Sequence, residues 1–169
     1  MLILYRGNGQ LGNALKDHLN LVEREVIIHH RWDYRDKSEE KQKEIYKDFK
    51  EFVGIHNKKE ICFISTANRD LNSYTYYKKE AEKYLIENCQ KGYVVRLPLI
   101  LGRGICSDFR DNLKKPFGKI ELITMDESIE WILNIINNKE RDKINEIHGE
   151  KISAKMIYNL IQFGKNGPK

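Results

Sequence analysis

The chain contains little cysteine and no recognisable set of metal ligands. Its three cysteines, Cys62, Cys89 and Cys106, are unevenly spaced and form no Cys-x-x-Cys pair, which argues against a disulfide framework and a zinc site. No Cys, Asp or Glu stands at ligand spacing from His29 and His30, so we expect no metal ion. Reduced thiols are typical of the cytoplasm, which is the location that we expect.

Long apolar runs and basic clusters are absent as well. No stretch approaches the length of a membrane span, and the N-terminus lacks the basic-then-apolar form of a signal peptide. The net charge of +5 is spread through both halves of the chain, and solvated lysine-rich helix faces explain most of it. We therefore expect neither a membrane nor a nucleic acid as a partner.

The residues that are present suffice for one folded domain. Hydrophobic residues make up 40% of the 169, enough for a sizeable core, and we find no internal repeat or low-complexity linker. We predict a single dinucleotide-binding domain over residues 1–163 and a disordered tail at 164–169.

Short apolar strands alternate with amphipathic helices along the chain. Strands are expected at residues 2–5, 25–29, 61–65, 93–101 and 119–124, and helices at 38–54, 74–90, 127–137 and after Ser153. Gly54 and Gly92 are the expected helix ends. This alternation predicts a compact Rossmann-like α/β fold, a parallel sheet with right-handed crossovers in the order 2-1-3-4.

The first twelve residues form a strand, a glycine turn and the start of a helix. This sequence is typical of a dinucleotide-binding unit, in which backbone amides at a helix N-terminus face a pyrophosphate and glycines allow its close approach. The candidate cofactor-binding residues here are Arg6, Gly7, Gly9, Gln10, Leu11 and Gly12. A strand-to-helix turn that binds nothing is the alternative interpretation.

Tyr74 and Lys78 stand four residues apart, so on a helix both side chains project from the same face. A lysine ammonium lowers the pKa of a nearby phenol and can orient a bound ribose. The pair therefore suits proton transfer beside a nicotinamide. An aromatic residue and a lysine on a half-exposed helix face are the alternative.

Six segments, taken in order, resemble the extended short-chain dehydrogenase/reductase family, which includes NAD-dependent nucleotide-sugar epimerases, dehydratases and reductases. They are Gly9–Gly12, Phe63–Ala67, Tyr74–Glu82, Val95–Gly102, Ile123–Ile132 and Ile147–Ser153. The resemblance implies that Tyr74 is the general acid/base, that Lys78 holds the nicotinamide ribose, and that Thr66 hydrogen-bonds the reacting oxygen. It further implies an oxidoreductase or epimerase acting on a nucleotide-linked sugar, and a homodimer formed through residues 74–90.

The chain also departs from this family. Aligning Gly9 and Gly12 places Arg6 at the family's first glycine, where its side chain either crowds the turn or meets a phosphate. The chain is short, so one or two strand-helix units are missing, and the brief loop between Thr66 and Tyr74 leaves the substrate side open. A non-catalytic NAD(P)-binding or regulatory protein, which could pair with a full-length family member, is therefore the alternative function.

The choice between NAD and NADP depends on the end of the second strand. Arg31 stands there, and a guanidinium suits the additional phosphate of NADP because it can donate two hydrogen bonds at once. Arg6 could assist. Arg31 as a solvated loop residue is the alternative, so both cofactors stay open, with NADP slightly favoured.

Overall fold

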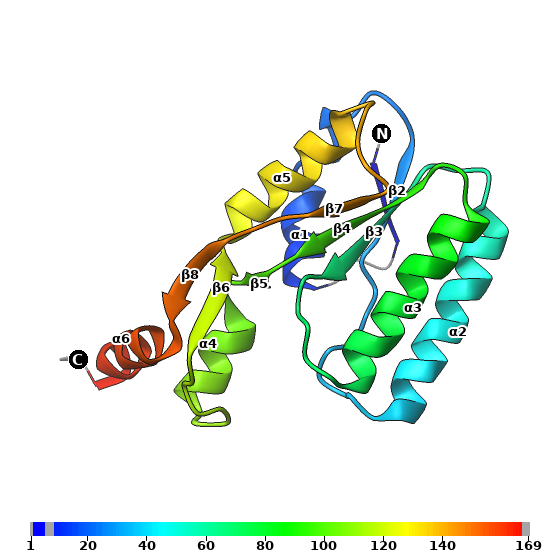
Figure 1. Ribbon diagram of the computed structural model, residues 1–169. Helices are drawn as coiled ribbons and strands as arrows, with labels where there is room; N and C mark the ends of the chain where they lie inside the picture. The colour runs from blue at the N-terminus through cyan, green and yellow to red at the C-terminus, as the bar shows by residue number, and fades with distance from the viewer. Residues whose placement is uncertain (1, 6–8, 167–169) are drawn as a thin grey trace.

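The computed structural model describes residues 2–5 and 9–166. In chain order its elements are β1 (Leu2–Tyr5), α1 (Gln10–Lys16), the 3-10 turn η1 (Leu19–Leu21), β2 (Val26–His29), α2 (Glu39–His56), β3 (Ile61–Thr66), α3 (Ser73–Asn88), β4 (Gly92–Leu97), β5 (Leu99–Ile100), α4 (Arg103–Arg110), β6 (Lys119–Ile123), α5 (Met125–Asn137), β7 (Ile144–Glu146), β8 (Glu150–Ser153) and α6 (Ala154–Asn166) (Figure 1).

Five parallel strands form the main sheet in the order β1-β2-β3-β4-β7. Helices cover both faces, which confirms the predicted Rossmann-like α/β fold (Figure 1). The predicted order 2-1-3-4 is wrong, because β2 lies between β1 and β3 and leaves β1 at the edge. As a result, β1 is not the point at which the strand order reverses, which is where dinucleotides bind in α/β sheets.

The two faces of the sheet have separate cores. On one face, α1 and α5 cover alternate strand residues such as Val26, Cys62 and Val95. On the other, α2 and α3 cover Ile27, Phe63 and their neighbours. The five strands are parallel and lie in chain order, so every crossover moves in the same direction across the sheet. Crossovers whose helices lie on opposite faces therefore have opposite hands. The expectation of uniformly right-handed crossovers is therefore wrong for this sheet.

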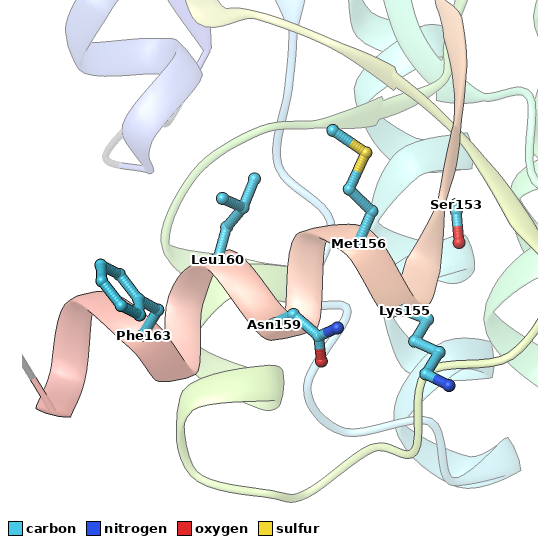
Figure 2. A pocket seen from close by; sticks show the side chains of 6 residues that line it. All are labelled: Ser153, Lys155, Met156, Asn159, Leu160 and Phe163. Carbon is cyan, nitrogen blue, oxygen red and sulfur yellow. The ribbon is translucent and has the colours of Figure 1, made fainter.

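A second, smaller sheet lies beyond β4, in the order β5-β6-β8. Pro98 separates β4 from β5, since proline has no N–H for a ladder, and so the expected strand at 93–101 is divided. Phe109 of α4 and Ile157 of α6 are buried in a third core on this sheet. Other residues of α6 form an exposed apolar stripe (Figure 2), namely Met156, Leu160 and Phe163.

Several expected element ends differ in the structure. Helix α2 passes through Gly54 and ends at His56, whereas Gly92 begins β4, where a Cβ would lie 2.9 Å from Leu85 Cγ. Gly92 thus allows α3 and β4 to pack closely. Helix α6 continues to Asn166, so part of the expected tail is helical. Among the described residues, no helix is long and apolar enough to cross a membrane.

Candidate functional site

The predicted catalytic residues lie where β3 ends and α3 begins. Thr66 is the last residue of β3, and a six-residue loop leads from it to α3. The start of α3 is fixed by a capping box, in which the Asn72 side chain accepts a hydrogen bond from the Thr75 N–H and the Thr75 side chain accepts one from the Asn72 N–H. Tyr74 therefore lies in the first turn of α3, near the carboxyl end of the sheet.

The structure brings Tyr74 and Lys78 together. The Lys78 ammonium lies 5.2 Å from the centre of the Tyr74 ring and 5.9 Å from that of Phe63. Lys78 is only 5% exposed, and its Nζ donates a hydrogen bond to the Ile64 carbonyl at 3.2 Å. This bond holds the lysine between α3 and β3, so the i, i+4 spacing was a sound guide to the pair.

Thr66 is held by its own loop. Its Oγ1 accepts a hydrogen bond from the Asn68 N–H at 3.1 Å, and its carbonyl accepts one from Lys79 Nζ at 2.9 Å. Burial is the main reason that the pKa of Lys79 lies below its ordinary value. Within the part of the chain that the structure describes, no hydrogen bond joins Thr66 to Tyr74. The hydroxyl proton of Thr66 is therefore still available for another acceptor.

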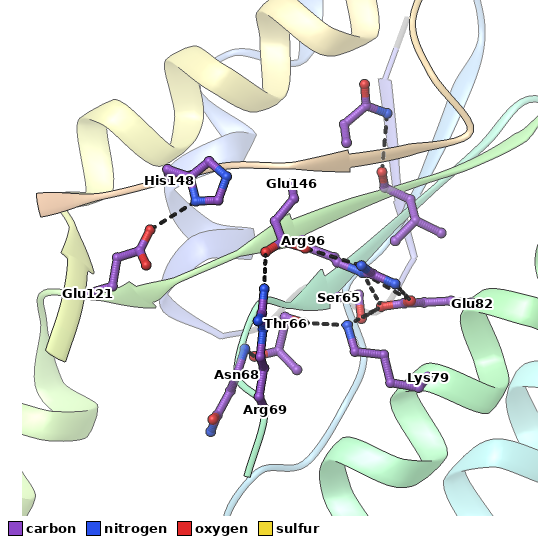
Figure 3. Close-up of polar contacts among 12 residues, drawn as sticks. Ser65, Thr66, Asn68, Arg69, Lys79, Glu82, Arg96, Glu121, Glu146 and His148 are labelled. Atoms are coloured by element: carbon purple, nitrogen blue, oxygen red, sulfur yellow. Dashed lines mark hydrogen bonds and ion pairs between the residues drawn. The ribbon is translucent and has the colours of Figure 1, made fainter. Parts of the chain in front are cut away.

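Behind these residues lies a buried ionic network that links α3, β3, β4 and β7 (Figure 3). Glu82, only 2% exposed, accepts hydrogen bonds from Ser65 Oγ at 2.5 Å, Arg96 Nη2 at 2.6 Å and Lys79 Nζ at 3.1 Å. Arg96 also donates to Glu146 at 3.1 Å. The hydrogen bonds that Arg96 donates to Glu82 raise the pKa of Arg96. The sequence alone gives Glu82 and Arg96 no separate role, since they stand there only as members of the segments Tyr74–Glu82 and Val95–Gly102.

Two further side-chain contacts lie close to this network (Figure 3). Arg69, on the loop after β3, is largely exposed and lies 3.6 Å from Glu146. His148 Nδ1 lies 3.2 Å from Glu121 Oε1, between β7 and the smaller sheet (Figure 3). The Gly149 N–H also donates to Glu121 at 2.9 Å, and this bond lowers the pKa of the carboxylate.

The candidate cofactor turn lies at the carboxyl end of β1. Gly9 is the extended N-cap of α1, Gln10 is exposed, and Leu11 and Gly12 are buried. Among the described residues other than its chain neighbours, a Cβ at Gly9 would meet only His30 Nε2, at 4.0 Å. The predicted roles of Arg6 and Gly7 fall outside the described residues.

Two histidines at the end of β2 lie between the glycine turn and Lys78. His29 is 3% exposed within a shell of aromatic rings, and burial lowers its pKa to about 3. Burial and the Lys78 ammonium lower the pKa of His30 to about 4. Both imidazoles are therefore neutral at pH 7. Their position after a buried strand was the signal that could have placed them at the site.

Arg31 follows these histidines. Its Nη1 lies 3.2 Å from Asp48 Oδ2 of α2, and both side chains are about half exposed. An ion pair exposed to this extent is weak, so another anion can replace the carboxylate. Arg31 follows the strand next to β1 and lines a small groove together with Tyr5 of β1 and Asp48 of α2.

The structure contains no clear metal site or disulfide in its described residues. No group of three or more His, Cys, Asp or Glu side chains there could hold a metal ion. All three cysteines are free, and burial raises the pKa of the Cys62 thiol to about 12. Cys62 is accordingly an unreactive core residue.

No family model and no curated protein matches this chain. Solved structures do. Bordetella bronchiseptica WbmG, solved with NAD and UDP, has a TM-score of 0.74 at 15% identity, over 99% of this chain and 79% of its own. A dTDP-4-dehydrorhamnose reductase from Clostridium acetobutylicum has 0.70 at 18% identity, over 95% and 80%. RMD from Pseudomonas aeruginosa, solved with NADPH, has 0.69 at 13% identity, over 94% and 81%.

The chain has the fold of these proteins. This likeness confirms, at the level of the fold, the resemblance to NAD-dependent epimerases, dehydratases and reductases. We call the carboxyl ends of β3 and β4 with α3 the α3 side, and β1 with Gly9 and the first turn of α1 the β1 side.

Proposed function

We propose that this chain binds a nicotinamide dinucleotide and oxidises, reduces or epimerises a nucleotide-linked sugar. The observation that carries the proposal is the buried Lys78 ammonium, 5.2 Å from the Tyr74 ring centre at the carboxyl end of β3. The likeness to proteins solved with NAD, NADPH and UDP supports the same kind of ligand.

Each residue of the α3 side has a distinct role in this proposal. Tyr74 exchanges a proton with the sugar hydroxyl or ketone, beside the Lys78 side chain on the same helix face. Thr66, whose oxygen already accepts the Asn68 N–H, donates its hydroxyl proton to the reacting sugar oxygen. Glu82 and Arg96 are positioning residues, since they hold α3 against β3 and β4.

The residues of the β1 side fit the phosphate end of the cofactor. Gly9 has an extended backbone, and the described residues other than its chain neighbours leave room for a Cβ there, with His30 Nε2 at 4.0 Å. Gly9, Gln10, Leu11 and Gly12 would hold the pyrophosphate through backbone N–H groups, and Lys78 would hold the nicotinamide ribose. When bound, the nicotinamide supplies hydride transfer.

The preference for NADP, the sugar substrate and the dimer are finer parts of the proposal. Arg31 would exchange its exposed pair with Asp48 for the additional phosphate of NADP. The sugar would enter between the loop after β3 and the smaller sheet, where Arg69 is exposed. A homodimer through residues 74–90 stays a prediction; Tyr76, 59% exposed on α3, is the position at which to test it.

One observation favours the alternative, a non-catalytic NAD(P)-binding or regulatory protein. Dinucleotides bind at the point where the strand order of an α/β sheet reverses, between strands on both sides of β1. Here β1 has a neighbouring strand only on the side of β2 among the described residues. The cofactor crevice therefore lacks one wall, and a full-length family member could supply it.

The two functions are separated by Tyr74→Phe, measured with NAD(H) and NADP(H) and a panel of UDP- and dTDP-linked sugars. If the chain is an enzyme, this change should lower turnover about 10²- to 10⁴-fold and leave nicotinamide binding intact. Tyr76→Phe, on the same helix but exposed, is the matched control and should retain wild-type turnover. Saturable binding of a nicotinamide cofactor without turnover of any sugar nucleotide, with the same affinity in Tyr74→Phe, would contradict the enzymatic function. It would support the non-catalytic binding protein.

A further inference from the structure

Strand β3 extends beyond its neighbour β2 at the candidate site. The last residue of β2, His29, pairs with Phe63, whereas β3 continues to Thr66. The last three residues of β3, 64–66, keep β4 as a neighbour on the other edge. Among the described residues, the end of β3 that carries Thr66 thus has a neighbouring strand on one edge only.

Two carbonyl groups at this end of β3 point towards the side on which β2 stops. The carbonyls of a strand point alternately to its two neighbours. The Glu60 carbonyl accepts the N–H of Ile27 in β2 at 2.9 Å. The carbonyls of Ile64 and Thr66 follow at even spacing, so they face the same side, beyond the end of β2. A backbone carbonyl that is shielded from water needs a partner, and here the donor has to come from another element.

Two consecutive lysines of α3 supply these donors. Lys78 Nζ donates to the Ile64 carbonyl at 3.2 Å. Lys79 Nζ donates to the Thr66 carbonyl at 2.9 Å (Figure 3). The family resemblance gives a role to Lys78, whereas Lys79 stands in the segment Tyr74–Glu82 without one. The structure thus adds a second lysine at the end of β3 where Thr66 lies.

Lys79 holds one side of the peptide group that joins Thr66 to Ala67. The Ala67 N–H, on the other side of the same group, donates to the Leu97 carbonyl at the end of β4, at 2.8 Å. This peptide group is therefore fixed from α3 and from β4 at once. The Thr66 side chain leaves the backbone directly beside it, and its Oγ1 accepts the Asn68 N–H at 3.1 Å. The direction of the Thr66 hydroxyl thus depends on the contact with Lys79.

The Lys79 ammonium is itself held by a buried carboxylate. Glu82 Oε1 accepts hydrogen bonds from Lys79 Nζ at 3.1 Å and from Ser65 Oγ at 2.5 Å (Figure 3). Only 32% of the Lys79 side chain is exposed, compared with 67% for Lys83, one turn later on the same helix. Lys79 therefore binds the end of β3, whereas Lys83 forms an exposed ion pair with Glu80.

We propose that Lys79 is a positioning residue, which directs the Thr66 hydroxyl towards the reacting sugar oxygen by holding the Thr66–Ala67 peptide group. The inference rests on the proposed function, in which Thr66 donates its hydroxyl proton to that oxygen. The two lysines then have different roles: Lys78 holds the nicotinamide ribose, and Lys79 holds the residue that contacts the sugar. Loss of the Lys79 ammonium should therefore slow the reaction without weakening cofactor binding.

Lys79→Met tests the proposal, because it removes the ammonium and keeps an unbranched stem. In steady-state kinetics with NAD(P)H and the UDP- and dTDP-linked sugars, kcat should fall about 10- to 100-fold, while the KM for the nicotinamide cofactor stays within about twofold. Lys79→Arg keeps the charge and N–H donors and should recover most of kcat. Lys83→Met is the matched control on the same helix and should retain the wild-type kcat. Lys79→Gln serves in the same way if Lys79→Met does not fold.

Hydrogen exchange gives a second measurement, which does not depend on activity. In Lys79→Met, the Ala67 amide should exchange at least about tenfold faster than in the wild type, relative to amides in the middle of β3. A residue that only stabilised the fold would speed exchange equally along the whole strand. Wild-type exchange at Ala67, an equal increase throughout β3, or an unchanged kcat in Lys79→Met would overturn the proposal. A wild type that turns over no sugar nucleotide would instead overturn the proposed function, and with it the role of Lys79 in that reaction.

Discussion

The α3 side and the β1 side of the candidate site are built differently. On the α3 side, β3 has a neighbouring strand on each edge, and Glu82 ties Ser65, Arg96 and Lys79 into one buried network. On the β1 side, the strand has four residues, an exposed Ile3 and, among the described residues, one neighbouring strand. The groups proposed for proton transfer are thus fixed from several directions, whereas the proposed phosphate turn stands at an edge.

The two sides depend on different parts of the sheet. The Tyr74–Lys78 pair depends on contacts among α3, β3 and β4. A crevice beside β1 has a neighbouring strand on the side of β2 alone among the described residues. The proposed binding of a dinucleotide would therefore depend most on the side that is least enclosed.

The largest expected effect on stability comes from Glu82→Ala on the α3 side. The change leaves Arg96 half-buried without its main partner, so we expect a loss of about 3–5 kcal/mol in the free energy of unfolding. Glu80→Ala, which removes only the exposed pair with Lys83, should cost under about 1 kcal/mol. Equal losses in urea denaturation would contradict the claim that the network stabilises this side.

The next effect concerns His29 on β2, which joins the two sides. Its pKa is lowered from 6.5 to about 3, so below pH 6.5 the unfolded chain binds a proton that the folded chain does not. Stability should fall as the pH drops from 6.5 towards 3, by up to about 1.4 kcal/mol per pH unit from this residue. His29→Phe should flatten that part of the profile, while His148→Gln, at an exposed position, should follow the wild type. A His29→Phe profile parallel to the wild type would show that His29 is not the cause.

A smaller effect should separate the two ends of the sheet in hydrogen exchange. We expect the amides of Leu2–Tyr5 to open at least about 2 kcal/mol more easily than those of β3, because in the described part of the chain β1 has one neighbouring strand and β3 has two. Similar protection would mean that the β1 side is as rigid as the α3 side, and the comparison would fail.

The smallest effect is on cofactor choice. Arg31→Ala should weaken NADP binding about tenfold and leave NAD binding unchanged if the guanidinium holds the additional phosphate. Asp48→Asn, which frees Arg31 from its ion pair, is the complementary variant and should not weaken NADP. An NADP affinity in Arg31→Ala equal to that of the wild type would assign Arg31 to the solvated loop.

Local patterns in the sequence predicted local structure well, and the long-range arrangement less so. Residues close together in the chain suffice to predict β2 and β3 from their apolar runs. The same holds for the Tyr74–Lys78 pair, which follows from the spacing of its two residues. The order of the strands in the sheet, and with it the place of β1, depends on contacts between segments far apart in the chain. The pattern of one segment does not show it. Strands β7 and β8 are short and polar, so they carry no alternation to detect. The role of Glu82 required Ser65, Arg96 and Glu146 to be brought together by the fold.

The central claim is that Lys78 and the glycine turn together bind a nicotinamide dinucleotide. Calorimetric titration of NADPH and NADH into the wild type and into Lys78→Met tests it most directly, with circular dichroism to verify that the variant is folded. The account predicts saturable binding at one site per chain, weakened at least about tenfold in Lys78→Met. Absence of saturable binding, or equal affinity in the folded variant, would contradict it.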